Sequence, residues 1–283
     1  MHCSFKNRQP KTYLDMRYFT KILLFVVALL VVAHDCEARP NVRRKERSKY
    51  DVFLLIGQSN MAGRGKLLEA DTLKDIKGVW LLNSEGKPEP ARNPLNKYSS
   101  IRKSYKMQQM SLGYSFATKV HKATGRKLLL VHNARGGTKV SWWLPESDYA
   151  DPNYYSEAVR RAKEAMKYGE LKAILWHQGC GDSGKNNRPL YMERLAKLAE
   201  NLRKDLNAPD VPFIAGELAY WRYTEMNKVI QTISHHIPNS DYVSAEGCDM
   251  LKDESDPHFG REGQLLIGER YADKVLEMVY GVK

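Results

Sequence analysis

The stretch DVFLLIGQSNMAG, residues 51–63, decides the fold that this chain is expected to adopt. Its first seven residues form a nearly continuous apolar run that ends in glycine, which is typical of a strand buried on both faces of a parallel sheet. Similar runs occur at residues 127–133, 172–179 and 211–218, and a fifth strand is expected at residues 241–247. The pattern therefore predicts five buried strands.

Helical periodicity fills the segments between these strands. The helices are expected at residues 112–124, 154–168, 189–206, 224–236 and 261–280. Alternation of strand and helix predicts an α/β fold, a three-layer αβα sandwich around a mainly parallel, five-stranded sheet with right-handed crossovers. Residues 66–110 are less regular and contain several prolines, so we expect a loop-rich insertion at one edge of the domain.

The composition is that of an ordinary globular protein. The chain has 283 residues, 42% of them hydrophobic, which is enough to bury a core without disulfide or metal support. The net charge of +12 is concentrated toward the amino-terminal end, where residues 39–49 hold six basic residues and one acidic residue. The remainder contains no arginine-rich helix and no aromatic-plus-basic motif, so nucleic acid is not an expected partner.

The amino-terminal end predicts export. An apolar run of 12 residues, 22–33, follows a basic stretch and is too short to span a bilayer comfortably. Such a run is typical of a secretory signal peptide, and Ala38 offers a cleavage point. We expect residues 1–38 to be the signal peptide, residues 39–49 a basic flexible spacer, and residues 50–283 a single domain that lies in the periplasm or outside the cell. The alternative is an uncleaved membrane anchor.

Chemically useful residues follow the predicted strands. In an open parallel sheet, ligands bind beyond the carboxyl ends of the strands. The sequences at those ends are GQSN (57–60), NARGGT (133–138), HQGCGD (177–182) and, after the fifth strand, the loop SDPHFG (255–260). One edge of the sheet therefore collects a serine, amides, paired glycines, carboxylates and a histidine.

A serine, a histidine and an aspartate in these loops suggest nucleophilic catalysis. Ser59 lies on a tight strand-to-helix turn, two positions after Gly57, which would expose its hydroxyl group. His258 lies on a loop after the last strand and could act as its general base, with Asp256 or Asp253 orienting the imidazole. The alternatives are an N-cap serine and a surface turn. Dinucleotide, Walker A and zinc-ligand spacings do not occur, so we expect no cofactor and no metal.

The motifs together point to a family. In this order, GQSNMAGRG, ARGGTKVSWW, WHQGCGD and DPHFGREGQLLIGERYA resemble the carbohydrate-esterase branch of the SGNH hydrolases, the sialate O-acetylesterase and acetyl xylan esterase family. The resemblance covers residues 50–280 and implies a flavodoxin-like SGNH hydrolase fold. It implies a serine esterase that removes O-acetyl groups from a carbohydrate through an acyl-enzyme intermediate. Xylan, pectin and sialoglycan all remain open as the acetylated substrate.

The resemblance also implies roles for individual residues. Ser59 matches the nucleophile and His258 the general base. The family usually places its aspartate three residues before the histidine, and Ser255 occupies that position here. Of the neighbouring carboxylates, Asp256 and Asp253, we choose Asp256 as the third member of the triad.

Further site residues follow from the same comparison of motifs. The Ser59 backbone N–H and the Gln178 side chain match the oxyanion hole, together with a backbone N–H at Gly113 or, in another alignment, Ser111. The residues expected to contact the substrate are Gln58, Arg64, Arg135, Gly136 and Gly137. The two arginines could recognise a carboxylate on the sugar or hold loops through backbone hydrogen bonds.

Two cysteines remain after the predicted cleavage. Cys180 replaces the glutamate of the commoner Q-G-E-x-D motif, and Cys248 follows the fifth strand. Because both are expected at the same sheet edge in an exported protein, we hypothesise a Cys180–Cys248 disulfide. Two buried thiols are the alternative.

Two other functions compete with this interpretation. A lipase or thioesterase of the same superfamily would need an apolar acyl channel, and a non-catalytic carbohydrate-binding module would tolerate the altered motif positions. Aromatic side chains suited to stacking on sugar rings occur near the predicted site at Trp142, Trp143, Tyr149, Tyr154 and Tyr155. They favour a carbohydrate ligand over an acyl chain, although packing in the core explains some of them equally well.

Overall fold

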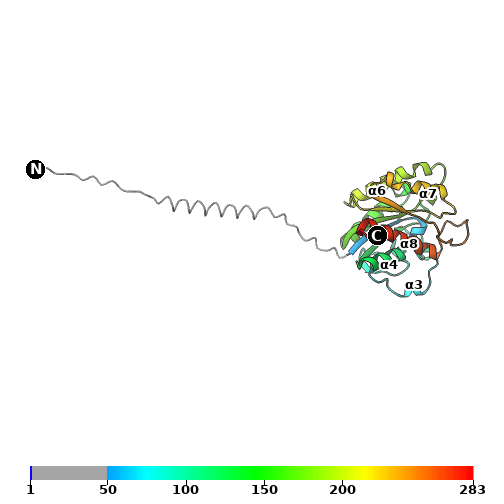
Figure 1. Cartoon of the computed structure of the whole chain (residues 1–283), viewed down its shortest axis with the longest axis horizontal. Coiled ribbons are helices and arrows are strands. Elements are labelled where there is room, and N and C mark those ends of the chain that lie inside the picture. Colours follow the sequence, from blue (N-terminus) through cyan, green and yellow to red (C-terminus); the bar gives the residue numbers. More distant parts are fainter. Residues whose placement is uncertain (2–49, 283) are drawn as a thin grey trace. The chain divides into compact units, whose positions relative to one another are not determined.

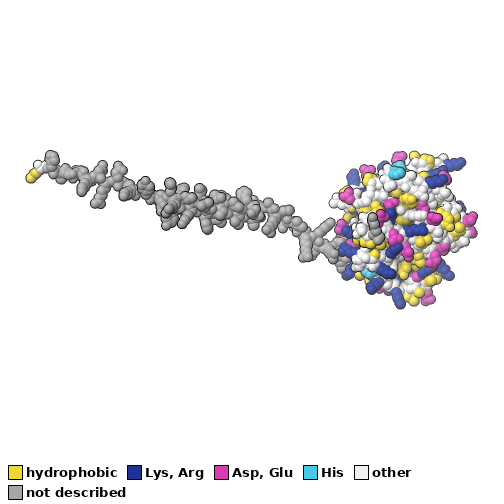
Figure 2. Space-filling model, in the orientation of Figure 1, with side chains coloured by type: hydrophobic (Ala, Val, Ile, Leu, Met, Phe, Trp, Pro, Cys, Tyr) yellow, Lys and Arg dark blue, Asp and Glu magenta, His cyan; other side chains and the backbone are white. Residues whose placement is uncertain are grey.

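The computed structural model describes Met1 and residues 50–282 (Figure 1). The predicted signal peptide, apart from Met1, and the predicted spacer lie outside the described residues. Within residues 50–282, no helix is long and apolar enough to cross a membrane. On the face shown in Figure 2, basic and acidic side chains are interspersed.

A seven-stranded mixed sheet forms the centre of the fold. Its strands are β1 (Tyr50–Gly57), β2 (Val79–Leu82), β3 (Pro88–Pro90), β4 (Leu128–Ala134), β5 (Gly169–His177), β6 (Phe213–Gly216) and β7 (Ser240–Val243). The strand order is β3-β2-β4-β1-β5-β6-β7. The β2–β3 pair is antiparallel, and every other pair of neighbouring strands in this sheet is parallel. Strand β1 therefore lies at the centre, between β4 and β5.

The expectation of five strands was wrong, because two more come from the segment expected to be a loop-rich insertion. Strand β2 extends the sheet beyond β4, with Val79 opposite Leu128 and its apolar side chains largely buried. Strand β3 follows at the edge and contains Pro88 and Pro90. Proline donates no hydrogen bond, so a proline-rich strand is tolerated at an edge but not in the middle of a sheet.

The helices lie in the connections between strands, except for the last one, which follows β7. They are α2 (Ser59–Ala62), α3 (Ala70–Leu73), α4 (Gly113–Thr124), α5 (Tyr154–Met166), α6 (Tyr191–Asp205), α7 (Thr224–Ile230) and α8 (Arg261–Tyr280). The five longer helices fall where helical periodicity predicted them. Helix α7 ends six residues early, and a 3₁₀ turn at Ile233–His235 follows it.

Two hydrophobic clusters cover the two faces of the sheet. Alternate residues of β1 point to opposite sides, so Leu54 and Ile56 join the cluster beneath α5, α6 and α7, whereas Phe53 and Leu55 join the cluster beneath α4 and α8. Figure 1 shows α6 and α7 on one side of the strands and α4 and α8 on the other. The three-layer αβα architecture is thus present, and the turns at the carboxyl ends of its strands remain open for a site.

Candidate active site

A glycine at the end of β1 allows a sharp turn into α2. Gly57 has a φ of 140°, and a Cβ atom placed on it would lie 2.3 Å from the carbonyl oxygen of His177. The next residue, Gln58, donates its backbone N–H to that same oxygen at 2.8 Å. Any side chain at Gly57 would push β1 away from β5. The turn places Ser59 as the first residue of α2, with 6% of its surface exposed.

The structure brings Ser59, His258 and Asp256 together in a hydrogen-bonded row. The His258 Nε2 atom lies 3.0 Å from Ser59 Oγ, and its Nδ1 atom lies 2.6 Å from Asp256 Oδ1. The backbone N–H of His258 donates to the same carboxylate oxygen at 3.0 Å. Asp253, the other candidate, accepts hydrogen bonds from Ser255 instead and is exposed. Of the two carboxylates, only Asp256 contacts the imidazole.

The imidazole of His258 is set up to accept a proton. Burial lowers the pKa of His258 below its ordinary value, although the neighbouring Asp256 carboxylate opposes that shift. The side chain is therefore neutral at neutral pH. With Nδ1–H donating to Asp256, the unprotonated Nε2 atom faces the hydroxyl group of Ser59.

Asn60 holds the His258 loop against α2, a contact that sequence reasoning missed. Its Nδ2 group donates to the carbonyl oxygen of Pro257 at 3.2 Å, and its Oδ1 atom accepts the Phe259 N–H at 3.2 Å. The amide thus contacts the residues on both sides of His258. Asn60 adjoins Ser59 in the motif GQSN, but its partners lie almost 200 positions away, so no local pattern reveals the contact.

Two further side chains position the row and were also missed. His132, buried at the end of β4, has its Nε2 atom 2.7 Å from the Met61 carbonyl oxygen and so must donate to the helix that begins with Ser59. Trp221 donates its indole N–H to the carbonyl oxygen of Asp256 at 3.2 Å. The contact of His132 holds the turn that carries Ser59, and the contact of Trp221 holds the loop that carries Asp256.

The structure corrects the role expected for Gln178. Its Nε2 group donates to the Thr138 carbonyl oxygen at 2.8 Å and to Asp182 Oδ2 at 2.6 Å, and the residue is fully buried. Both amide hydrogens are therefore used within the protein and none is left for an oxyanion. Burial raises the pKa of Asp182, and the Gln178 amide partly offsets this cost by donating to the carboxylate. Gln178 joins two loops rather than presenting a donor to Ser59.

Gly113, whose backbone N–H was expected in the oxyanion hole, lies at the start of α4. It is the first residue of α4, and a Cβ atom on it would meet side-chain atoms of Leu55, Leu95 and His132 at 3.0–3.4 Å. These contacts make it a core position, where a small residue allows α4 to approach the sheet closely. The alternative, Ser111, lies against Gly63 at the end of α2, where a Cβ atom on that glycine would be 2.9 Å away.

The glycine-rich loop after β4 lies directly beside the nucleophile. A Cβ atom on Gly136 would lie 3.3 Å from Ser59 Cβ and 2.8 Å from Arg64 Nη2. Arg64 donates to the carbonyl oxygens of Gly63 and Met107, which holds its guanidinium group against this loop. Lys103 Nζ lies 3.6 Å from the Cβ position of Gly137. Glycines and cations thus border Ser59 on this side.

The two remaining residues expected to contact the substrate, Gln58 and Arg135, form hydrogen bonds with other parts of the protein. Gln58 is buried and accepts the Gly179 N–H at 3.1 Å, so it ties the nucleophile turn to the loop after β5. The guanidinium group of Arg135 donates to the Ile101 carbonyl oxygen at 2.9 Å. Its central carbon lies 5.6 Å from the centre of the Tyr154 ring. Arg135 therefore borders a hollow next to the site.

The proposed disulfide is wrong, because Cys180 and Cys248 are free. Cys180 packs against the hydrophobic cluster beneath α6 and α7, whereas Cys248 is buried in the cluster beneath α4 and α8. The two thiols thus belong to opposite faces of the sheet although both follow strand ends. Burial raises the pKa of Cys180 to about 11 and that of Cys248 to about 12.

Most of the aromatic residues expected at the site belong to the core. Trp143, Tyr154 and Tyr155 are buried and pack beneath the sheet. Trp142 and Tyr149 stack on each other with ring centres 3.4 Å apart and planes at 6°. Tyr149 is 53% exposed, so this pair presents an aromatic face to solvent. Within residues 50–282, no group of three or more His, Cys, Asp or Glu residues could hold a metal ion.

Comparison with known proteins gives the chain a family. The model of the family described as "Carbohydrate esterase, sialic acid-specific acetylesterase" matches residues 49–277. A protein of Arabidopsis thaliana named "Probable carbohydrate esterase" is 29% identical over 245 residues, which cover 80% of this chain and 90% of that protein.

Solved structures share the fold. An X-ray structure of an Arabidopsis thaliana protein matches with a TM-score of 0.71 and 26% identity, over 82% of this chain and 99% of that one. The crystal structure of NanS matches with a TM-score of 0.63 and 16% identity, over 83% of this chain and 99% of that one. Because the family match spans most of the chain, the protein belongs to the family of sialic acid-specific acetylesterases within the carbohydrate esterases.

Proposed function

We propose that the chain is a serine esterase that removes O-acetyl groups from a carbohydrate through an acetyl-enzyme intermediate. The observation that carries the proposal is the row of hydrogen bonds from Asp256 through His258 to Ser59, at 2.6 Å and 3.0 Å. A nucleophile, a base within hydrogen-bond reach and a group that orients the base are the parts that acyl transfer requires. The family of the chain supplies the substrate class, an acetylated carbohydrate.

The reaction follows from this geometry. Ser59 Oγ attacks the carbonyl carbon of the acetyl ester while His258 Nε2 takes its proton. The tetrahedral intermediate collapses, the bond to the sugar oxygen breaks, and His258 returns the proton to that oxygen. A water molecule then attacks acetyl-Ser59 with the same base, which releases acetate and restores the Ser59 hydroxyl. Asp256 holds the imidazole and stabilises its positive charge in both steps.

The oxyanion hole is assigned to backbone N–H groups. The N–H of Ser59 lies in the first turn of α2, where amides have no acceptor within the helix. We assign the second donor to the N–H of Gly136, because a Cβ atom on that residue would lie 3.3 Å from Ser59 Cβ. Removing one such donor typically costs about 2.7–4 kcal/mol of transition-state stabilisation. This assignment leaves out the Gln178 side chain, whose amide hydrogens are donated within the protein, and the role expected for the Gly113 N–H stays a prediction.

Acetate release tests the proposal. The parent protein and its Ser59→Ala variant are incubated with acetylated xylan, acetylated pectin, O-acetyl sialic acid and 4-nitrophenyl acetate. We expect release by the parent and loss of release in the variant, together with covalent labelling of Ser59 by an organophosphonate. If neither release nor labelling occurs in the folded parent, the chain is a carbohydrate-binding protein on a hydrolase scaffold and the proposal is wrong.

A further inference from the structure

Two hollows with arginine side chains flank the nucleophile strand. The first, with a volume of about 460 Å³, is lined by Arg102, Arg135 and Tyr149 among others. It adjoins the site because the backbone N–H of Arg135 donates to the Gly57 carbonyl oxygen at 3.0 Å, and the next residue, Gly136, touches Ser59. Its volume falls in the range of ligand sites.

The second hollow lies beside the loop after β5. It has a volume of about 420 Å³ and is lined by Ser183, Arg188, Arg222 and Tyr223 among others. The Ser183 hydroxyl donates to the carbonyl oxygen of Cys180 at 2.9 Å, in the loop that Gln58 ties to the nucleophile turn. This hollow is therefore also next to the site, but it is built by the ends of β5 and β6.

The order of strands places the two hollows on opposite sides of Ser59. Strand β4, which leads into Arg135, pairs with one edge of β1, and β5 pairs with the other edge. Strand β6, which precedes Arg222 and Tyr223, lies one strand further out. A ligand occupying both hollows must pass over the end of β1, where Ser59 lies.

The arginines of both hollows form no ion pair with a carboxylate in the described part of the chain. Arg135 donates to the Ile101 carbonyl oxygen and Arg102 to that of Ser99, at 2.9 Å and 2.7 Å, which fixes each guanidinium group without neutralising it. Among residues 50–282, the arginines that form ion pairs with carboxylates are Arg92, Arg126, Arg160 and Arg261. Each hollow also has one carboxylate at its lining, Asp151 at the first and Glu225 at the second. Glu225 pairs with Lys228, and neither carboxylate forms an ion pair with an arginine of its hollow, so two arginines face one carboxylate in each.

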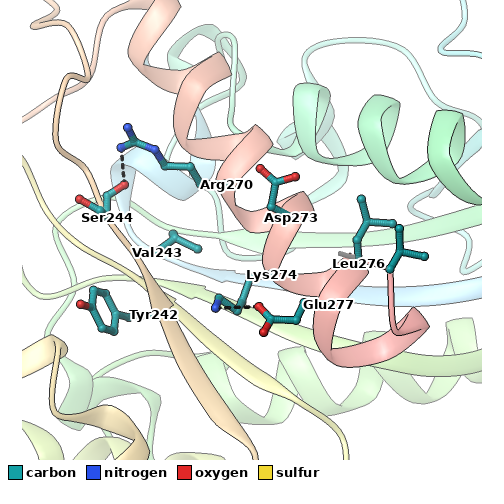
Figure 3. Close-up of a pocket in the computed structure, with 9 residues that line it drawn as sticks. Tyr242, Val243, Ser244, Arg270, Asp273, Lys274, Leu276 and Glu277 are labelled. Atoms are coloured by element: carbon teal, nitrogen blue, oxygen red, sulfur yellow. Dashed lines mark hydrogen bonds and ion pairs between the residues drawn. The ribbon is translucent and has the colours of Figure 1, made fainter.

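A third hollow has more of its charged side chains in ion pairs. It lies between β7 and α8, has a volume of about 600 Å³, and is shown in Figure 3. There, Lys274 pairs with Glu277 at 3.0 Å and with Asp241 at 2.8 Å, and Asp273 pairs with Lys119 at 2.7 Å. Arg270, which also borders this hollow, donates to the backbone carbonyl oxygens of Ser244 and Glu246, much as Arg102 and Arg135 donate to backbone oxygens. The difference lies in the carboxylates, since the third hollow has Asp273 and Glu277 at its lining, both paired with lysines, and each hollow beside Ser59 has one carboxylate against two arginines.

We propose that the acetylated substrate is a polymer of sugars that carry carboxylates, and that one chain of it occupies both hollows across Ser59. Guanidinium groups bind carboxylates through paired, charge-assisted hydrogen bonds. Two such sites on opposite sides of the nucleophile fit a chain better than a single sugar. The exposed aromatic face of Tyr149, next to Arg135, suits stacking on a sugar ring. This inference rests on the proposed esterase function.

The test compares a charged polymer with a neutral one. Acetate release is measured on acetylated polygalacturonate, acetylated xylan and a single O-acetyl sialic acid, for the parent and for the variants R102Q/R135Q and R188Q/R222Q. Each arginine pair should favour the charged polymer, so we expect the ratio of kcat/KM on polygalacturonate to that on xylan to fall about tenfold in each variant. Thermal unfolding checks that each variant is folded.

A matched control removes two charges elsewhere. Lys122 and Lys204 are exposed at the carboxyl-terminal ends of α4 and α6, which lead back to the opposite edge of the sheet. We expect K122Q/K204Q to keep the parent's ratio. Equal activity of the parent on both polymers, preference for the single sugar, or equal ratios in the control and arginine variants would overturn the proposal.

Binding separates this inference from the esterase proposal. Binding of unacetylated polygalacturonate to the Ser59→Ala variant is measured by calorimetry at low and high salt. We expect binding that weakens about tenfold when either arginine pair is replaced and that weakens with salt. If this binding is observed without any Ser59-dependent acetate release in the parent, only the esterase proposal fails. If release is observed without binding, only the polymer proposal fails.

Discussion

Acidification should destabilise this protein through two histidines buried beneath the site. His132 and His177 are fully buried, and burial lowers the pKa of His132 to about 4 and that of His177 to about 3, from an ordinary value of 6.5. Protonation of either ring would place a charge in the core. Because both pKa values are lowered in the folded state, the unfolded chain binds more protons below pH 6.5. Stability is therefore complete above pH 6.5 and is lost as the pH falls toward 4 and 3.

The size of the effect follows from these values. One unit of pKa difference corresponds to about 1.4 kcal/mol. Between pH 7 and pH 5, the unfolded chain gains up to two protons that the folded chain does not bind. Over the 1.5 pH units below 6.5, each histidine should cost about 2 kcal/mol, so the free energy of unfolding should fall by about 4 kcal/mol.

Urea unfolding at pH 7, 6 and 5 measures this loss. The variant H132Q keeps a donor near the Met61 carbonyl oxygen but does not titrate, so its loss between pH 7 and pH 5 should be about 2 kcal/mol. The control is H235Q, because His235 is exposed in the folded protein, and it should lose as much as the parent. A free energy of unfolding that stays constant down to pH 5, or equal losses in H132Q and H235Q, would refute the reasoning.

Four further predictions concern the site, the cysteines and the amino-terminal end. The substitution D256N should lower kcat about 10⁴-fold in the acetate assay, because the imidazole loses its orienting carboxylate. The control D253N should keep the parental activity, because Asp253 is exposed and bonds to Ser255 rather than to His258. The substitution N60A should lower kcat about tenfold with little change in KM, because it removes the hydrogen bonds that hold the loop carrying His258. The variant N60D should not restore kcat, since a carboxylate cannot donate to the Pro257 carbonyl oxygen. A fall in thermal stability as large as the fall in kcat would contradict a positioning role. Titration of the unfolded protein without reductant should find both Cys180 and Cys248 as thiols, and a change on adding reductant would contradict the structure. Finally, cleavage after Ala38 predicts a mature chain that begins at Arg39, which mass spectrometry of the exported protein checks; an intact amino-terminal end would indicate an anchor.

Local sequence patterns were sufficient for the central strands, the long helices and the edge where the site lies. Apolar runs such as 51–57 must be buried on both faces, and that requirement depends on composition alone. The outer strands β2 and β3 escaped prediction because they lie in an irregular segment that contains several prolines. Such a segment becomes a strand only when a neighbour is present to pair with it. Edge strands depend on the sheet that they join.

The motifs located Ser59 and His258, but the tertiary structure decided how the residues around them are used. Sequence order could not choose between Asp256 and Asp253, since the choice depends on the direction in which one loop turns its side chains. Gln178 has a donor suited to an oxyanion, yet its hydrogens are directed to Asp182 and Thr138 by the packing of two loops.

The cysteines and Asn60 are further cases in which the tertiary structure decided what a residue contacts. Cys180 and Cys248 both follow strand ends, but a strand end can direct a side chain to either face, and these two lie on opposite faces. Asn60 contacts Pro257 and Phe259 only because the fold brings β1 and the last loop together. The sequence by itself determined which segments are buried and which residue types could do chemistry, because burial and reactivity are properties of the side chains. Only the tertiary structure decided their hydrogen-bond partners, because those depend on contacts between residues that are distant in the chain.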